Sequence, residues 1–139
     1  MKLLKLNIAF IIVFVAVQFG IAGDVEWKEL DAFHAVMSES FHPAEGGNLQ
    51  PVRDDASELL KKAKEWRASP IPDGYDKEKT AKALKVLVAK CKQLKSAVKA
   101  KKDDKELTML ITEAHNVFHK IVEECKTAGE HKHTDEHKH

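Results

Sequence analysis

Apolar residues recur at helical spacing in four segments of the chain, and no segment alternates in the way that a strand does. The first of these segments is predicted to be a helix over residues 25–41. Its apolar face consists of Leu30, Phe33, Met37 and Phe41. The helix is expected to end at His42–Pro43, because a proline pushes the residue before it out of the helical region.

The other three helices are bounded by prolines, glycines and capping residues. A second helix is predicted over 51–68, since its first turn can accept Pro51, and the stretch SPIPDG at 69–74 separates it from a third helix at 76–101. Asp103 and Glu106 have the spacing of a capping box, which predicts a tight turn near residue 102 and a fourth helix that reaches Cys125. Short connections between long amphipathic helices favour an all-α fold, an up-down-up-down four-helix bundle.

The N-terminus has the layout of a secretory signal peptide. Lys2 and Lys5 precede an apolar run that begins at Ile8 and ends in small residues, and this run is short for a membrane span. We therefore predict a signal peptide at 1–22, a bundle at 23–127 and a disordered His-rich tail at 128–139. The protein is expected to be exported, and periplasmic if its source is Gram-negative, with no membrane association after cleavage.

Composition narrows the function classes. The 117 residues after Ala22 suffice for one domain with a modest core, and their 21 basic and 22 acidic residues are interspersed, which argues against a nucleic-acid partner. The chain contains neither a nucleophile elbow nor a phosphate-cradling glycine loop, so we predict that it is not an enzyme, apart from chemistry at an open metal position. A homodimer is compatible with this composition.

Histidine placement suggests a metal site. Outside the tail, the chain has two histidines on the first helix and two on the fourth, and His115 and His119 have the i, i+4 spacing that lets two imidazoles reach one ion. Counting 1.5 Å per residue from the turns puts His34, Cys91 and His115 in neighbouring layers of the bundle. The predicted function is binding of a transition-metal ion, zinc or copper. The core ligands would be His34 and His115, completed from among His42, His119, Met37 and Cys91.

Each of these residues also has a simpler interpretation. A histidine on an apolar face can be a hydrogen-bonded core residue, Met37 can be flexible packing, and the pair His115 and His119 can be a chance surface pattern. In an exported protein two cysteines suggest a disulfide. The turn near residue 102, however, offsets Cys91 from Cys125 by roughly 15 Å along the bundle, too far for a bridge.

A small exported four-helix bundle with Met37 on its first helix and His115 and His119 on its last resembles the cytochrome b562 and cytochrome c′ group. The resemblance implies a b-type haem electron carrier in which Met37 is one axial ligand and His119 or His115 is the other. The chain has no CxxCH motif, so covalent c-type attachment of haem is excluded. A cofactor-free structural or stress-related bundle is the remaining alternative.

The segments FHxVM, FHPAEGGNLxP and HNVFHKIVEEC are also similar to those of a set of small exported bacterial proteins. This likeness implies no biochemical role. It implies that His34, His42, His115 and His119 belong together as a unit.

Overall fold

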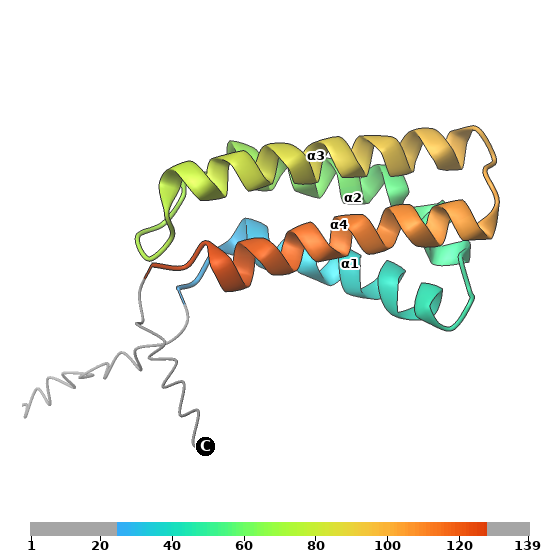
Figure 1. The fold of residues 1–139 in the computed structure, drawn as a ribbon, viewed down its shortest axis with the longest axis horizontal. Helices are drawn as coiled ribbons and strands as arrows, with labels where there is room; N and C mark the ends of the chain where they lie inside the picture. Colours follow the sequence, from blue (N-terminus) through green and yellow to red (C-terminus); the bar gives the residue numbers. More distant parts are fainter. Residues whose placement is uncertain (1–24, 128–139) are drawn as a thin grey trace, which may run out of the picture.

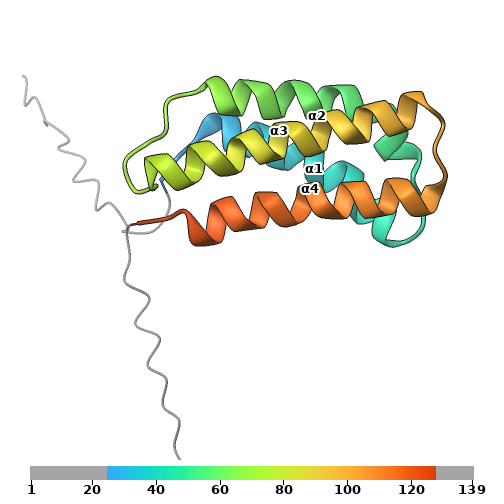
Figure 2. The same cartoon turned by 45° about the horizontal axis from the view of Figure 1, so that its top comes forward.

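The computed structural model describes residues 25–127 as four antiparallel helices (Figure 1). These are α1 (Lys28–Glu45), α2 (Gln50–Ala68), α3 (Lys77–Lys99) and α4 (Asp104–Glu124). Each helix packs against the next one in the chain and α4 returns to α1, so that α2 and α3 lie on the opposite side of the ring from the α1–α4 seam (Figure 2). The predicted all-α four-helix bundle is confirmed. The predicted signal peptide and His-rich tail lie outside the described residues.

The core is built from the apolar stripes that the sequence pattern predicted. Phe33 of α1, Trp66 of α2 and Phe118 of α4 form a triangle whose ring centroids are 5.4, 5.9 and 6.0 Å apart. Phe33 and Trp66 are completely buried, and aromatic pairs at these separations add to the stabilisation from burial. The triangle therefore fixes how α1, α2 and α4 are rotated about their own axes. Among residues 25–127, no helix is long and apolar enough to cross a membrane.

The first helix extends beyond its predicted end, and the prediction that it ends at His42–Pro43 is wrong. Pro43 lies in the last turn of α1, which ends at Glu45. The Pro43 carbonyl accepts hydrogen bonds from the backbone N–H groups of Gly46 and Asn48, and the N–H of Gly47 donates to Ala44. This is a Schellman motif with Gly47 at φ 86°, a conformation that suits glycine. The motif supplies partners for the terminal carbonyls, so one proline near the end is tolerated.

The turn between α3 and α4 forms where the sequence predicted it. The Asp103 carboxylate accepts a hydrogen bond of 2.9 Å from the backbone N–H of Glu106, which caps α4. Arg53 of α2 reaches this turn, donating to the Lys102 carbonyl at 3.2 Å and to the Asp104 carboxylate at 2.8 Å. These contacts fix one end of the bundle.

Both termini of the described chain meet at the other end. The loop before α3 and the segment after α4 are joined by two backbone hydrogen bonds of 2.8 Å, from Asp76 N–H to the Cys125 carbonyl and from Thr127 N–H to the Gly74 carbonyl. The Trp27 indole N–H donates to the Ser69 hydroxyl at 2.9 Å, which ties the start of α1 to the end of α2. The bundle is therefore braced at both ends.

Replacing Lys101 by glycine is expected to stabilise the bundle by about 0.5–1 kcal/mol. Lys101 lies just after the end of α3 at φ 54°, a left-handed conformation that is costly for a residue with a side chain. Urea unfolding followed by circular dichroism measures the change. The matched control is Lys102→Gly, which removes the same charge at a position without positive φ and should not stabilise. Equal effects of the two substitutions would contradict the conformational explanation.

Candidate metal site between α1 and α4

The seam between α1 and α4 carries all four histidines that the sequence singled out. These two helices approach each other along fewer residues than any other neighbouring pair in the ring. Two aromatic rings, Phe41 of α1 and Phe118 of α4, close the seam from within. The histidines lie on the outer side of these rings, so the seam is apolar inside and lined with imidazoles outside.

His115 and His119 face one another at the centre of this site. Their Nε2 atoms are 3.2 Å apart, and the Nδ1 atom of His119 lies 3.1 Å from Glu123 Oε1. One set of neutral tautomers satisfies every contact: His119 donates from Nδ1 to Glu123, and its Nε2 lone pair accepts from the Nε2–H of His115. Glu123 therefore orients the His119 ring so that its Nε2 points toward His115.

The two histidines of α1 lie at the edge of the same site. His34 stacks on Phe118 with ring centroids 5.0 Å apart and planes only 9° from parallel. His42 is exposed, and its Nδ1 lies 3.3 Å from Glu45 Oε2. Neither side chain is enclosed by the core, so both can change rotamer without disturbing the packing.

His115 is the electrostatic centre of the group. Its ring stacks on Phe41 at a centroid separation of 3.7 Å, which removes part of it from water. This partial burial lowers the pKa of His115, and electrostatic repulsion from His119 lowers it further. Glu45 opposes the shift, and smaller repulsions from His42 and His34 add to it. His115 is therefore held in the neutral form, which is the form that binds metal ions.

The structure differs from the expectation of a core site. His34 is exposed and His115 only partly buried, so the prediction that they are core residues is wrong. The reason lies in the rotation of α1: Phe33 occupies the inward position, and the next residue points about 100° away, along the seam. Axial counting contained no information about this direction.

Cys91 and Met37 are separated from the histidines by burial. Cys91 is completely buried in α3, and this burial raises the pKa of its thiol to about 12, which disfavours the thiolate that a metal requires. Cys91 and Cys125 are both free thiols, as the predicted turn required. Met37 is completely buried as well. As placed, neither sulfur is available to an ion at the seam.

The residues proposed for haem do not fit that group in their present positions. Met37 lies within the close-packed core, whereas His119 is on the surface, paired with Glu123. A haem bound between them would require Met37 to leave the core. The arrangement favours a small ion at the seam over a planar macrocycle between the helices.

The carboxylates of the site were missed by sequence reasoning. Glu45 follows His42 by three residues and Glu123 follows His119 by four, which are the spacings at which helical side chains meet. These spacings could have identified both partners. Within residues 25–127, however, no group of three or more His, Cys, Asp or Glu side chains is already arranged to hold a metal ion. The seam presents a pair of imidazoles with further candidates beside it.

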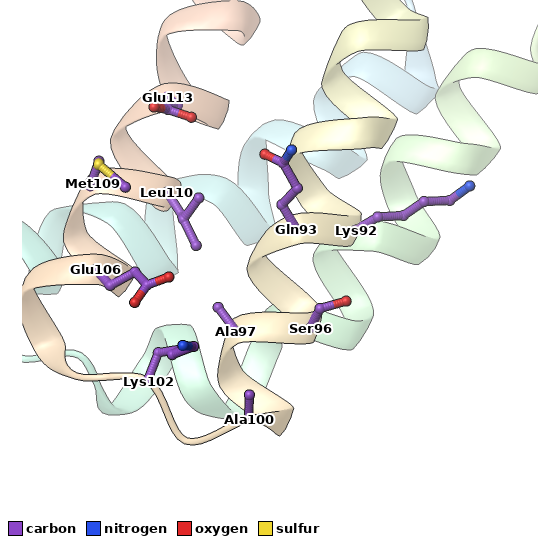
Figure 3. Close-up of a pocket in the computed structure, with 10 residues that line it drawn as sticks. All are labelled: Lys92, Gln93, Ser96, Ala97, Ala100, Lys102, Glu106, Met109, Leu110 and Glu113. Carbon is purple, nitrogen blue, oxygen red and sulfur yellow. The ribbon is translucent and has the colours of Figure 1, made fainter.

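The α3–α4 face has a hollow of different character (Figure 3). It has a volume of about 670 Å³, lies near the turn between these helices, and includes the exposed side chain of Met109. Lys92, Lys102, Glu106 and Glu113 contribute charged groups, but its lining contains neither histidine nor cysteine. None of the predicted ligands belongs to this hollow.

No protein-family model matches the chain, and neither a curated protein nor a solved structure is significantly similar to it. The structure has the four-helix architecture that the resemblance to the cytochrome b562 group implies, and these comparisons do not confirm that resemblance further.

The bundle is expected to lose stability as the pH falls below about 6.5, the unfolded-state pKa of histidine. The folded protein holds His115 neutral, so the unfolded state binds more protons in this range and is favoured by acid. Urea unfolding at about pH 7.5 and about pH 5, with a chelator present, measures the difference. A His115→Gln variant should show a smaller loss of stability than wild type, and an equal loss in the two proteins would contradict the assignment to His115.

Proposed function

We propose that this protein binds a transition-metal ion, zinc or copper, at the surface seam between α1 and α4. His115 and His119 form the centre of the site. The observation that supports this most directly is the 3.2 Å separation of their Nε2 atoms. Two nitrogens bound to one tetrahedral zinc ion at about 2.0–2.1 Å are roughly 3.3 Å apart, so the pair is already spaced for a shared ion.

The site supplies the outer partners that metal-binding histidines require. A ligating imidazole commonly donates its other N–H to a carboxylate, which fixes the ring and strengthens the ligand. Glu123 occupies this position on His119, and Glu45 is its counterpart on His42. Binding would replace the hydrogen bond between His115 and His119, with His115 shifting its proton to Nδ1 so that both Nε2 lone pairs face the ion.

Completion of the coordination falls to His34 and His42. His34 stacks on Phe118, and the His42 ring lies 6.0 Å from the Phe41 ring on which His115 stacks. Both histidines are exposed. A change of rotamer at one of these exposed side chains is proposed to add a third imidazole to the pair. Imidazole ligands with carboxylates behind them suit zinc and copper and are poor ligands for magnesium or calcium. The proposed role is that of a binding module, not of an enzyme.

Titration of the purified protein with zinc and copper, followed by calorimetry, tests this proposal. The tail histidines His131, His133, His137 and His139 are first replaced by asparagine so that they cannot bind the ion themselves. In this background, His115→Ala with His119→Ala is expected to weaken binding by at least about 100-fold, because the central pair is lost. Removing His34 and His42 together should weaken binding less but measurably.

Cys91→Ala is the matched control, since this change removes a metal-competent but buried group and should leave the affinity unchanged. Unchanged binding in the His115 and His119 double variant would overturn the proposal. Loss of binding in Cys91→Ala with the fold intact would shift the site into the core. A Soret band after reconstitution with haem, abolished by Met37→Leu, would support the haem alternative in place of the metal site.

A further inference from the structure

Positive charge is concentrated on α3 although the chain as a whole is nearly neutral. This helix contains eight lysines and a single glutamate, a net charge of +7, whereas the formal charge of the whole chain is +1. This asymmetry is not evident from the sequence as a whole, because most of the acidic residues lie outside α3 and balance its lysines in the net charge. One side of the bundle is consequently much more basic than the rest.

The lysines of α3 form a row along its border with α2. Lys85, Lys92 and Lys99 follow one another at seven-residue intervals, two helical turns or about 10.5 Å, so they lie on the same side of the helix. Lys95 lies between the last two, and all four are exposed. A hollow lined by Lys85 and by Arg67 of α2 places Lys85 at this border. Lys92 also borders the hollow on the α3–α4 face, but its side chain extends away from Glu106 and Met109 (Figure 3).

The neighbouring helix adds further cations to this side. Lys64 precedes Arg67 by three residues, so both lie on the same side of α2, and both are exposed. We refer to six residues as the α2–α3 basic face: Lys64, Arg67, Lys85, Lys92, Lys95 and Lys99. The two helices that carry it lie side by side over most of their length (Figure 2).

Three of the five acidic side chains of the same two helices pair with lysines that lie outside the basic face. Glu58 and Glu65 both pair with Lys62, at 3.8 and 3.2 Å, and Glu78 pairs with Lys82 at 2.8 Å. The six cations of the basic face therefore keep an excess of positive charge over an extended area. An area of this kind attracts a partner with many negative charges.

The sequence alone led to the expectation of no membrane association after cleavage, and the clustering of lysines on one side of the bundle changes that expectation. We propose that the α2–α3 basic face docks on the surface of a bilayer that contains anionic phospholipid. Five of its six cations are lysines, which interact as hydrated point charges, and the face includes no aromatic side chain on which a nucleic-acid base could stack. Anionic headgroups move laterally and can match any spacing of lysines. Docking in this orientation leaves the α1–α4 seam, on the opposite side of the ring, facing the solvent.

Sedimentation with phospholipid vesicles tests the proposal. The protein from Gly23 onward is used. The buried core of the described part of the chain runs from Trp27 to Cys125, and the apolar N-terminal run is removed so that it cannot bind lipid by itself. Vesicles contain either equal parts of phosphatidylglycerol and phosphatidylcholine or phosphatidylcholine alone. Working at about pH 7.5 with a chelator keeps the tail histidines neutral and metal-free. Binding is expected only with phosphatidylglycerol, and it should disappear as about 0.5 M salt screens the charges.

The decisive variant replaces Lys85, Lys92, Lys95 and Lys99 by glutamine, which preserves helix propensity. Its partition onto anionic vesicles should fall by about 100-fold or more, since four charges near the lipid surface are lost. The matched control replaces four lysines that are exposed but lie off the basic face by glutamine: Lys28, Lys105, Lys120 and Lys126. This control variant should retain most of the binding to anionic vesicles. Circular dichroism verifies that both variants remain helical.

Three outcomes would overturn the proposal. The first is equal loss in both variants, which would mean that only net charge matters. The second is absence of wild-type binding to the anionic vesicles. The third is displacement from the vesicles by a stoichiometric amount of duplex DNA, which would identify a nucleic acid as the preferred partner. Metal binding at the seam is measured separately and does not depend on the result.

Discussion

The contact among Phe33, Trp66 and Phe118 determines much of what this protein presents to its surroundings. These rings come from three helices and meet at centroid separations of 5.4–6.0 Å, deep in the apolar core. Once Phe33 faces inward, the rotation of α1 is fixed and His34 must lie along the seam. Phe118 fixes the rotation of α4 in the same way. His115 precedes it by three residues and His119 follows it directly, so the inward position of Phe118 directs both histidines toward the seam. The histidine group therefore results from the packing of the aromatic core.

Much of the fold could be predicted from the sequence, since it depends on local signals. The apolar stripes identified four helices, and the Asp103 cap located the last turn. The end of α1 could not be predicted from Pro43 alone, because the compensating hydrogen bonds come from residues after the helix, Gly46, Gly47 and Asn48. The energetic cost of Pro43 within the helix is offset by the Schellman motif after it, and this motif is visible only in the folded backbone.

The candidate site was predicted less completely, and the reason is geometric. Counting residues along a helix gives an approximate depth of a side chain, and the structure sets His34 against Phe118 and His115 against Phe41. Direction around the axis depends on which apolar residue the core selects, and adjacent positions differ by about 100°. Cys91 illustrates the same point, since it is directed into the core, where burial keeps its thiol protonated. The sequence-based prediction used only the position of each histidine along its helix, and it therefore placed in the core a group of histidines that lies at the surface.

Protons and a metal ion would compete for the same nitrogen atoms at the seam. The stacking of His115 on Phe41 and the proximity of three other imidazoles disfavour its protonated form. A neutral imidazole is the form that binds a metal ion. The same contacts that disfavour protonation of His115 would therefore favour binding of an ion near neutral pH. An ion there would join α1 to α4 where the ring has its sparsest packing, and any ligand that binds only the folded state adds to its stability. The weakest seam of the bundle is thus the one at which binding would have the largest structural effect.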